Sequence, residues 1–170
     1  MEALGRTFDI SAGIVPVDLA AAAATGKRVH LLNASGVTIV IVKAAGTAGE
    51  DPTFTLKQHT AATGGTTANL ADIDHYYLKN EATLDGDETW VKKTQTAAAT
   101  IVDPGGATTS AEEQQIIAIE VEATALADDY EWVSLDVADV GVGAQLGAVL
   151  YILRDLTVQR APANLVNPQA

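Results

Sequence analysis

The sequence predicts an all-β protein, an antiparallel β-sandwich of the jelly-roll type with about eight or nine strands. Several short runs alternate apolar and polar residues, which is the pattern of half-buried strands. Turn-forming residues separate the runs at intervals of about ten to fifteen residues, a spacing typical of sandwiches and barrels. No comparable pattern predicts a long amphipathic helix. A chain of 170 residues is large enough to bury one core without a disulfide, and it contains no cysteine.

The strongest strand signals lie in the C-terminal third. Gln114–Ala123 and Tyr130–Val137 each place their large aliphatic residues at every second position. Gly147–Val158 is nearly continuous apolar sequence before Arg154, a pattern typical of a strand buried on both faces. These three runs are therefore predicted to form the centre of the antiparallel structure.

The N-terminal run is apolar but interrupted. Phe8–Leu19 contains Gly13 and Pro16, and proline cannot donate a hydrogen bond to a neighbouring strand. The run is therefore predicted to be an arm or an edge strand. Asp18 is predicted to cap a short Ala-rich helical turn that continues through Ala24.

Five further runs are predicted to be strands. Lys27–Asn33 and Val37–Lys43 are joined by small residues and predict a hairpin. Thr53–His59, Ala71–Lys79 and Glu88–Gln95 follow, each with alternating or β-branched residues. The intervening glycine-, proline- and alanine-rich segments are predicted to be loops, at 44–52, 60–68 and 96–113.

One folded unit is predicted, with extensions at both ends. Residues 1–26 are assigned to the arm and the helical turn, residues 27–160 to the sandwich, and residues 161–170 to an exposed tail, because that last segment has two prolines and few large apolar side chains. The predicted core consists of aliphatic residues from six runs: Val29, Leu31, Ile39, Ile41, Leu56, Ile117, Ile119, Val121, Val133, Leu135, Leu150 and Ile152.

The charge is strongly acidic and unevenly distributed. The net charge is −12, from 22 acidic and 10 basic residues, and no lysine or arginine lies between Lys93 and Arg154. Such a surface repels phosphate backbones and anionic lipids. The composition therefore predicts neither a nucleic-acid partner nor a membrane partner.

The residues that could support catalysis are few. The three histidines, His30, His59 and His75, fall in different predicted strands and in none of the usual metal-binding spacings. None of the four serines lies in a GxSxG motif. We therefore predict no catalytic residue, no cofactor and no metal site, and a protein that is not an enzyme.

Two alternatives remain open from the acidic residues. The turn 85–88 and the groups Asp128, Asp129 with Glu131 and Asp136 with Asp139 could supply oxygen ligands to calcium, although their spacing is not that of an EF-hand. Paired carboxylates could also serve a glycosidase.

A carbohydrate-binding module or adhesin is the other alternative. Such a module would bind sugars through exposed aromatic side chains, here Trp90, Trp132 and Tyr76. Aromatic residues make up only 5% of the chain.

Four runs, in fixed order, span nearly the full chain: PVDLAAAAATGKRVHLLNASGVTIVIVKAAGTAGEDPTFTLKQ, ETWVKKTQ, EEQQIIAIEVEATAL and YEWVSLDVADVGVGAQLGAVLYILRD. In order and composition they resemble small virion proteins encoded in the head-gene region of tailed bacteriophages. The resemblance implies a structural protein of the capsid, most directly a decoration (cement) protein with a β-sandwich fold. A head–tail connector or a tail component is the alternative in the same setting.

The resemblance also implies a location and partners. The protein would be made in the host cytoplasm and sit on the capsid exterior, bound to the major capsid protein and to copies of itself as a homotrimer at local three-fold positions. The proline-interrupted arm offers an unpaired edge to such a neighbour. We therefore expect Phe8, Ile10, Ile14 and Val15 to be interface residues, either between subunits or with the capsid protein.

Overall fold

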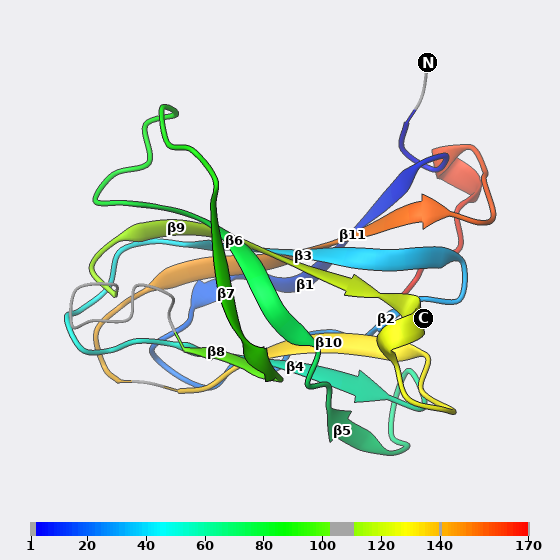
Figure 1. Ribbon diagram of the computed structural model, residues 1–170, viewed down its shortest axis with the longest axis horizontal. Helices are drawn as coiled ribbons and strands as arrows, with labels where there is room; N and C mark the ends of the chain where they lie inside the picture. The colour runs from blue at the N-terminus through cyan, green and yellow to red at the C-terminus, as the bar shows by residue number, and fades with distance from the viewer. Residues whose placement is uncertain (1–2, 103–110, 140, 170) are drawn as a thin grey trace.

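Two antiparallel sheets pack face to face in the computed structural model, which describes residues 3–102, 111–139 and 141–169 (Figure 1). Sheet A has the strand order β1-β11-β3-β9-β6-β7, and sheet B has the order β2-β10-β4-β5, with β8 also paired to β4. The prediction of an all-β sandwich is confirmed. The strands are β1 (Phe8–Asp18), β2 (Val29–His30), β3 (Ala34–Lys43), β4 (Thr53–His59), β5 (Thr67–Asn69), β6 (Ile73–Glu81), β7 (Val91–Ala98), β8 (Thr100–Val102), β9 (Gln114–Glu122), β10 (Trp132–Val137) and β11 (Leu146–Leu156).

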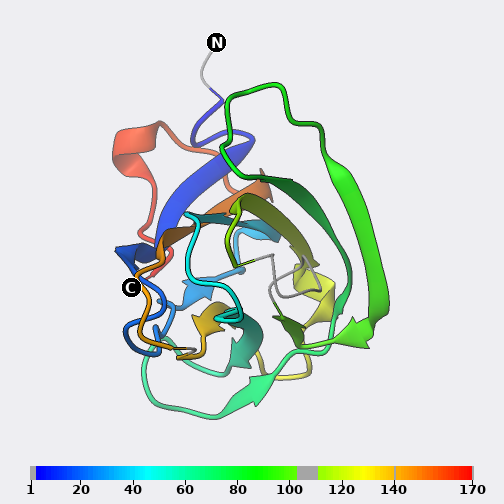
Figure 2. The same ribbon diagram turned by 90° about the vertical axis from the view of Figure 1, so that its left-hand side faces the viewer.

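The pairing of the strands is nested. β1 pairs with β11, β2 with β10, β3 with β9, and β4 with β5, all antiparallel. The chain therefore folds back on itself as one long hairpin whose arms alternate between the sheets, which is the jelly-roll arrangement. The β6–β7 hairpin extends sheet A beyond β9 and curves down the side of the sandwich (Figure 2).

Two short strands raise the number in the described residues to eleven, above the expected eight or nine. β5 and β8 have three residues each; β8 lies within the predicted loop 96–113, and β5 begins within the predicted loop 60–68 and ends one residue beyond it. Both pair only with β4, so they form because an edge of sheet B is available nearby in space. Most of the remaining predicted loop 96–113 lies outside the described residues.

The predicted hairpin between 27–33 and 37–43 is wrong. β2 belongs to sheet B and β3 to sheet A, so the chain crosses from one sheet to the other at residues 31–33. Both segments bury aliphatic residues in the same core from opposite sides, for example Val29 and Ile39. Alternating apolar and polar residues indicate that one face of a strand is buried. They do not indicate which of the two sheets the strand joins.

The Ala-rich helical turn after Asp18 is also absent. Residues 19–22 form bends, although the Asp18 carboxylate does accept the backbone N–H of Ala20 at 3.0 Å. Leu19 is fully buried and its N–H donates to the carbonyl of Gln145 at 2.8 Å. The side chain of Leu19 therefore packs in the core, and its backbone N–H is hydrogen-bonded to the segment before β11. Both contacts hold this segment in a non-helical conformation.

Ten of the twelve predicted core residues are buried. The exceptions are Leu150 and Ile152, because β11 is covered on one face only. Its inward residues are Val149, Tyr151 and Leu153, whereas Leu150 is 39% exposed and Ile152 is half-buried on the outside. The prediction that this strand is buried on both faces is wrong.

Ile119 lies at the centre of the core and is fully buried. Replacing it with alanine is expected to lower the free energy of unfolding by about 2–4 kcal/mol, the usual cost of removing a large aliphatic side chain from a packed site. Urea denaturation would measure this. Ile10→Ala on the outer face, where Ile10 is 50% exposed, is the matched control and should cost clearly less. Equal losses would contradict the assignment of Ile119 to the core.

Helical structure in the described residues is limited to two three-residue 3₁₀ turns, Ala123–Ala125 and Pro162–Asn164. No helix in this part of the chain has the length and apolarity that crossing a membrane would require.

The C-terminal segment is tied to the sandwich, although it was predicted to be an exposed tail. Residues 161–164 are exposed, but Leu165 packs against the core. The carbonyl of Pro168 accepts the backbone N–H of His30 at 2.8 Å, and the side-chain amide of Gln169 donates to the carbonyl of Ala12 at 2.6 Å. The segment therefore forms a strap beside β1 and β2.

Candidate functional site: the outer face of sheet A

The four predicted interface residues all lie in β1, which is the outermost strand of sheet A, as its proline predicted. Ile10 and Val15 are exposed, and Phe8 is half-buried. Ile14 points inward and belongs to the core cluster, so it is a core residue and not a surface anchor. The structure thus leaves Ile10, Val15 and part of Phe8 accessible.

The outward side chains of sheet A form a continuous apolar surface. Hydrogen-bonded register aligns Ala12, Leu150, Val40, Ala118 and Tyr77 in one row across five strands. The rows on either side add aliphatic residues from the same strands. We call this surface the outer apolar face, and it comprises Ile10, Ala12, Val40, Val42, Ile116, Ala118, Ala148, Leu150 and Ile152.

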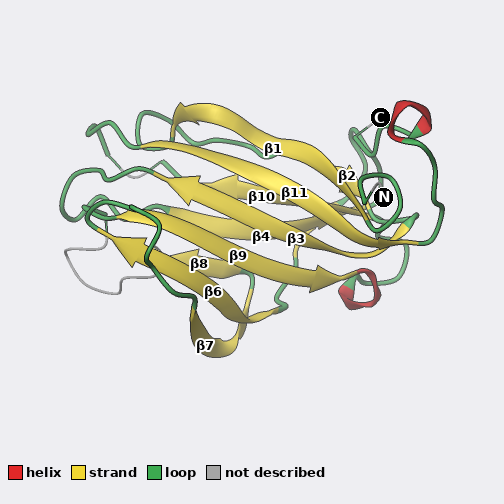
Figure 3. Cartoon of the chain, turned by 90° about the horizontal axis from the view of Figure 1, so that it is seen from above, coloured by secondary structure: helices red, strands yellow, loops and turns green. Residues whose placement is uncertain are grey.

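This face lies towards the viewer in Figure 3, and the described chain leaves most of it open. At one edge, Leu84 of the β6–β7 loop lines a shallow hollow together with Val42 and Ala148. Ile10 is 50% exposed, Val42 is 42% exposed and Leu150 is 39% exposed, while the smaller residues between them are half-buried by their neighbours. A contiguous apolar surface of this kind marks an interaction site more often than scattered apolar residues do.

Charged residues border the face at two places. Lys79 of β6 stands in the row of Ile116 and Val42, and its ammonium lies 5.4 Å from the ring centroid of Trp90. Glu120 of β9 stands two rows further along the strands, opposite Thr38. Carboxylates also lie near Lys79, at Glu81 and Glu88, and Arg154 pairs with Glu122 one row beyond Glu120, so each end of the face carries both charges.

The sequence contains a signal for this face, although the predicted alternation of the strands does not include it. Val40 and Val42 in β3, and Ile116 in β9, interrupt the expected alternation with apolar residues on the second face of each strand. A strand that is apolar on both faces needs a cover on both sides. In a two-layer protein without helices to cover the sheets, that second face must remain exposed.

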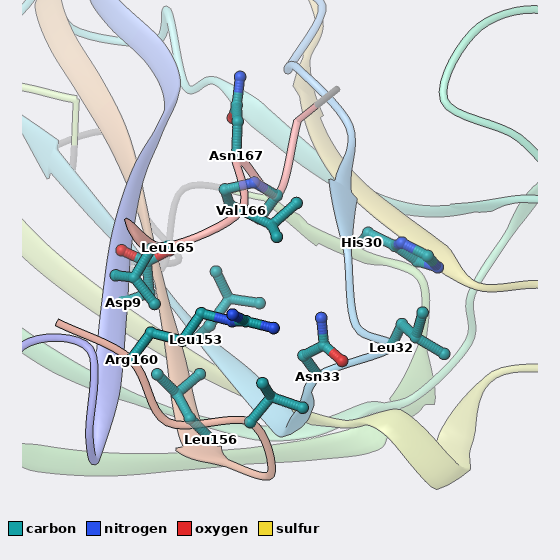
Figure 4. A pocket seen from close by; sticks show the side chains of 12 residues that line it. Asp9, His30, Leu32, Asn33, Leu153, Leu156, Arg160, Leu165, Val166 and Asn167 are labelled. Atoms are coloured by element: carbon teal, nitrogen blue, oxygen red, sulfur yellow. The ribbon is translucent and has the colours of Figure 1, made fainter. Parts of the chain in front are cut away.

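A small cavity lies beneath the C-terminal strap (Figure 4). Its volume is about 80 Å³, and its walls come from β2, β11 and the strap. Leucine and valine side chains form half of the lining, and Asp9, His30 and Arg160 are among the other residues. This space could hold a few water molecules, and it is too small to be a substrate pocket.

The structure places each histidine in a separate local arrangement. His30 stacks on Trp132 with ring centroids 4.3 Å apart, and His75 contacts the Asp74 carboxylate at 2.5 Å. His59 is buried between two hydroxyls, with Nδ1 2.9 Å from Thr67 Oγ1 and Nε2 2.9 Å from Ser134 Oγ.

The contact between His59 and Ser134 resembles a nucleophile and its base, but it cannot act as one here. Both side chains are buried, and the partner of the second imidazole nitrogen is a hydroxyl and not a carboxylate. Burial in the protein, followed by repulsion from Arg28, lowers the pKa of His59 to about 4. A histidine with so low a pKa is a weak base at neutral pH.

Of the acidic groups considered as possible calcium ligands, the turn 85–88 comes together and is joined by Glu81. The carboxylate oxygens of Glu81, Asp85, Asp87 and Glu88 lie within 4.8 Å of one another. Desolvation, followed by repulsion from Asp87 and Asp85, raises the pKa of Glu81. The other groups do not gather among the described residues; Asp136 instead pairs with Lys57 at 2.7 Å and accepts the N–H of Gly26.

The aromatic residues named for a sugar-binding surface are not presented together. Trp132 and Tyr76 are buried, and only Trp90, 50% exposed, is available. A platform for stacking sugars would need several exposed rings, so this arrangement does not favour the carbohydrate-binding alternative.

Comparisons of the chain with protein-family models, with curated proteins and with solved structures found no match. The class of the protein therefore rests on its fold and surfaces. It is an all-β sandwich of jelly-roll topology, and in the described residues the outer face of sheet A carries exposed apolar side chains.

Proposed function

We propose that this chain is a structural protein of a bacteriophage capsid, a decoration protein that binds the outside of the assembled head and stabilises it. The observation that carries the proposal is the outer apolar face of an otherwise acidic protein. Such a face is costly to leave in water and is stabilised when another protein surface covers it. The resemblance of the sequence to phage head-region proteins supplies the setting.

Charge favours the outside of the shell. A packaged genome is a dense polyanion, and a protein with net charge −12 would be repelled by it. Three of the six lysines lie on the β6–β7 hairpin, at Lys79, Lys92 and Lys93, next to the Glu81–Glu88 carboxylates. This distribution offers no extended basic surface for a nucleic acid.

Stabilisation follows from linkage. A protein that binds the assembled shell and not its dissociated subunits shifts the equilibrium towards the shell, by an amount that grows with its concentration relative to its dissociation constant. The partners in this proposal are the major capsid protein and further copies of this chain.

Heating of particles tests the proposal. Particles stripped of this protein are expected to release their DNA at a lower temperature than intact particles, and adding back the folded protein should restore the original temperature. The same protein unfolded beforehand is the control. Truncation of residues 1–17 is unsuitable, because it removes most of β1 and the core residue Ile14. Equal heat resistance of stripped and intact particles would exclude the decoration role and favour a connector or tail position.

A further inference from the structure

We infer that a polar groove at the end of the C-terminal strap is an anion site, and that it binds a carboxylate side chain of a protein partner. The groove shares no residue with the outer apolar face, and the inference does not depend on the proposed function. It rests on two cations that have no carboxylate partner, on a guanidinium held in place by the fold and on the hydrogen-bonding groups that the strap leaves unused.

The groove is formed by three segments that are distant in the sequence. It is lined by residues 26–28, which precede β2, by residues 62–64 of the loop between β4 and β5, and by Asn167 and Gln169 of the strap. Its open volume is about 610 Å³. Unlike the small cavity beneath the strap, the groove therefore has room for a side chain and the peptide that carries it.

Two neighbouring cations, Lys27 and Arg28, line the groove of this acidic protein. Within the described chain, Lys27 has no ion pair through its ammonium group, and Arg28 contacts only carbonyl and hydroxyl oxygens. No acidic residue is among the described residues that line the groove. The groove is therefore a local positive site in a chain of net charge −12.

The carboxylates nearest to this segment in the hydrogen-bond network already have partners. Asp136 accepts a backbone N–H of the segment at 3.0 Å, but it pairs with Lys57 at 2.7 Å and its side chain is only 17% exposed. Glu131 contacts Nε2 of His30 at 3.3 Å. Neither carboxylate lines the groove, so the two cations remain available to an acidic group from outside.

Arg28 is held in place by the loop between β4 and β5. Its Nη1 donates to the carbonyls of Ala61 and Gly64 at 2.7 Å each, and its Nη2 lies 3.4 Å from Thr67 Oγ1. These contacts fix the guanidinium before a ligand arrives, so little side-chain entropy is lost on binding. Nε makes no hydrogen bond within the described chain, and Nη2 keeps a second N–H. Arg28 therefore retains charged donors for a carboxylate.

The strap adds one donor and one acceptor. Oδ1 of Asn167 accepts the backbone N–H of Gln169 at 3.0 Å, which leaves the amide nitrogen of Asn167 to donate; Figure 4 shows this nitrogen pointing away from the cavity beneath the strap. Gln169 donates its amide nitrogen to the carbonyl of Ala12 at 2.6 Å, which leaves its amide oxygen to accept. A carboxylate with a peptide N–H beside it matches this set.

The described lining contains no aromatic ring on which a sugar could stack. The groove therefore favours the side chain of an acidic residue in a protein over a sugar acid, although both present the same carboxylate.

An NMR titration of the isotope-labelled full chain with the blocked peptide acetyl-Gly-Glu-Gly-amide tests the inference. The backbone signals of Lys27, Arg28, Gly64 and Gln169 are expected to shift and to saturate in the millimolar range, because one solvent-exposed charged group binds weakly. Acetyl-Gly-Gln-Gly-amide has the same shape without the charge and should give no saturating shift. An equal response to both peptides would overturn the inference, and so would tighter binding of glucuronate than of the glutamate peptide.

Asn167→Asp is the most informative variant. It keeps the oxygen that accepts the N–H of Gln169 and replaces the donor with a negative charge, so the affinity for the glutamate peptide should fall at least about tenfold. Asn164→Asp is the matched control, because it adds the same charge to an exposed turn of the strap outside the groove and should leave the affinity unchanged. Lys27→Gln should lower the affinity about threefold to fivefold.

Circular dichroism and thermal melting verify that each variant is folded. An unchanged affinity in folded Asn167→Asp, or an equal loss in Asn164→Asp, would overturn the inference, whatever the outcome of the particle experiment.

Discussion

Replacing Tyr151 with alanine is expected to be among the most destabilising single truncations in this protein. Tyr151 of β11 is the largest fully buried side chain, and its hydroxyl accepts the backbone N–H of Leu135 in β10 at 3.0 Å. It is therefore a direct polar link between sheet A and sheet B. Removing a buried aromatic ring costs about 3–5 kcal/mol, and leaving a buried N–H without an acceptor adds about 1–3 kcal/mol. Since single domains have a total stability of about 5–15 kcal/mol, this loss is large enough to unfold a marginally stable protein.

Two glycines show how closely the rest of the chain fits around this ring. A Cβ at Gly13 would lie 2.5 Å from the Tyr151 ring carbon Cζ, and one at Gly26 would lie 2.8 Å from its hydroxyl. Gly13→Ala is therefore expected to destabilise as well, because the ring or the strand β1 must move. Burial, opposed by the Leu135 N–H, raises the pKa of Tyr151, so the phenol stays neutral over the accessible pH range.

Tyr151→Phe separates the hydrogen bond from the packing. It keeps the ring and removes the acceptor, so it should cost about 1–3 kcal/mol, well below the alanine variant. Urea denaturation of both variants, with tyrosine replaced by phenylalanine at the half-buried Tyr77 as a control, measures the difference. Equal losses for the phenylalanine and alanine variants would show that the ring contributes little, which would contradict its place between the sheets.

The sequence was sufficient to predict the elements of this fold, because most strands alternate strictly. In β4 and β9 the predicted inward residues Leu56, Ile117 and Ile119 are all fully buried, and the predicted bounds agree closely with the observed ones. The proline in Phe8–Leu19 also predicted an edge strand correctly. These features depend on local periodicity and on single-residue chemistry.

The assignment of the strands to the two sheets could not be predicted from local sequence patterns. Nothing in residues 27–43 indicates that β2 and β3 enter different sheets, since their partners, β10 and β9, lie about a hundred and about eighty residues further along the chain. In β6 the buried side changes from Ile73 to Tyr76 and Leu78, and the pairing with β7 is irregular at the same place. Strict alternation cannot predict such a bulge.

The candidate site was predicted only in part, for the same reason. Ile10 and Val15 were identified from the interrupted strand, but the larger face was missed because Leu150 and Ile152 were assigned to a core. An apolar run predicts that both faces of a strand are buried. Whether the second face is covered by the same chain or by another molecule depends on how many layers of secondary structure the fold has. That number is a property of the whole fold.

Acidification is expected to remove a second large contribution to stability, through His59. Burial, followed by the nearby Arg28 cation, lowers the pKa of His59 to about 4, below the value of about 6.5 that an unfolded histidine has. Between these two values the unfolded chain binds a proton that the folded protein excludes. Unfolding is therefore favoured as pH falls through this interval, and the full contribution is present only above about pH 6.5.

The expected size of this effect is about 3 kcal/mol, from the difference between the two pKa values at about 1.4 kcal/mol for each unit. His59→Gln keeps hydrogen-bonding groups for Ser134 and Thr67 but cannot titrate. Denaturation of the wild type and the variant from pH 7 to pH 4 should give curves that converge as pH falls, because the wild type alone loses this contribution, while the carboxylates common to both cancel. Parallel curves would mean that His59 is protonated in the folded state at mild acidity, which its two hydroxyl partners and its burial between the strands oppose.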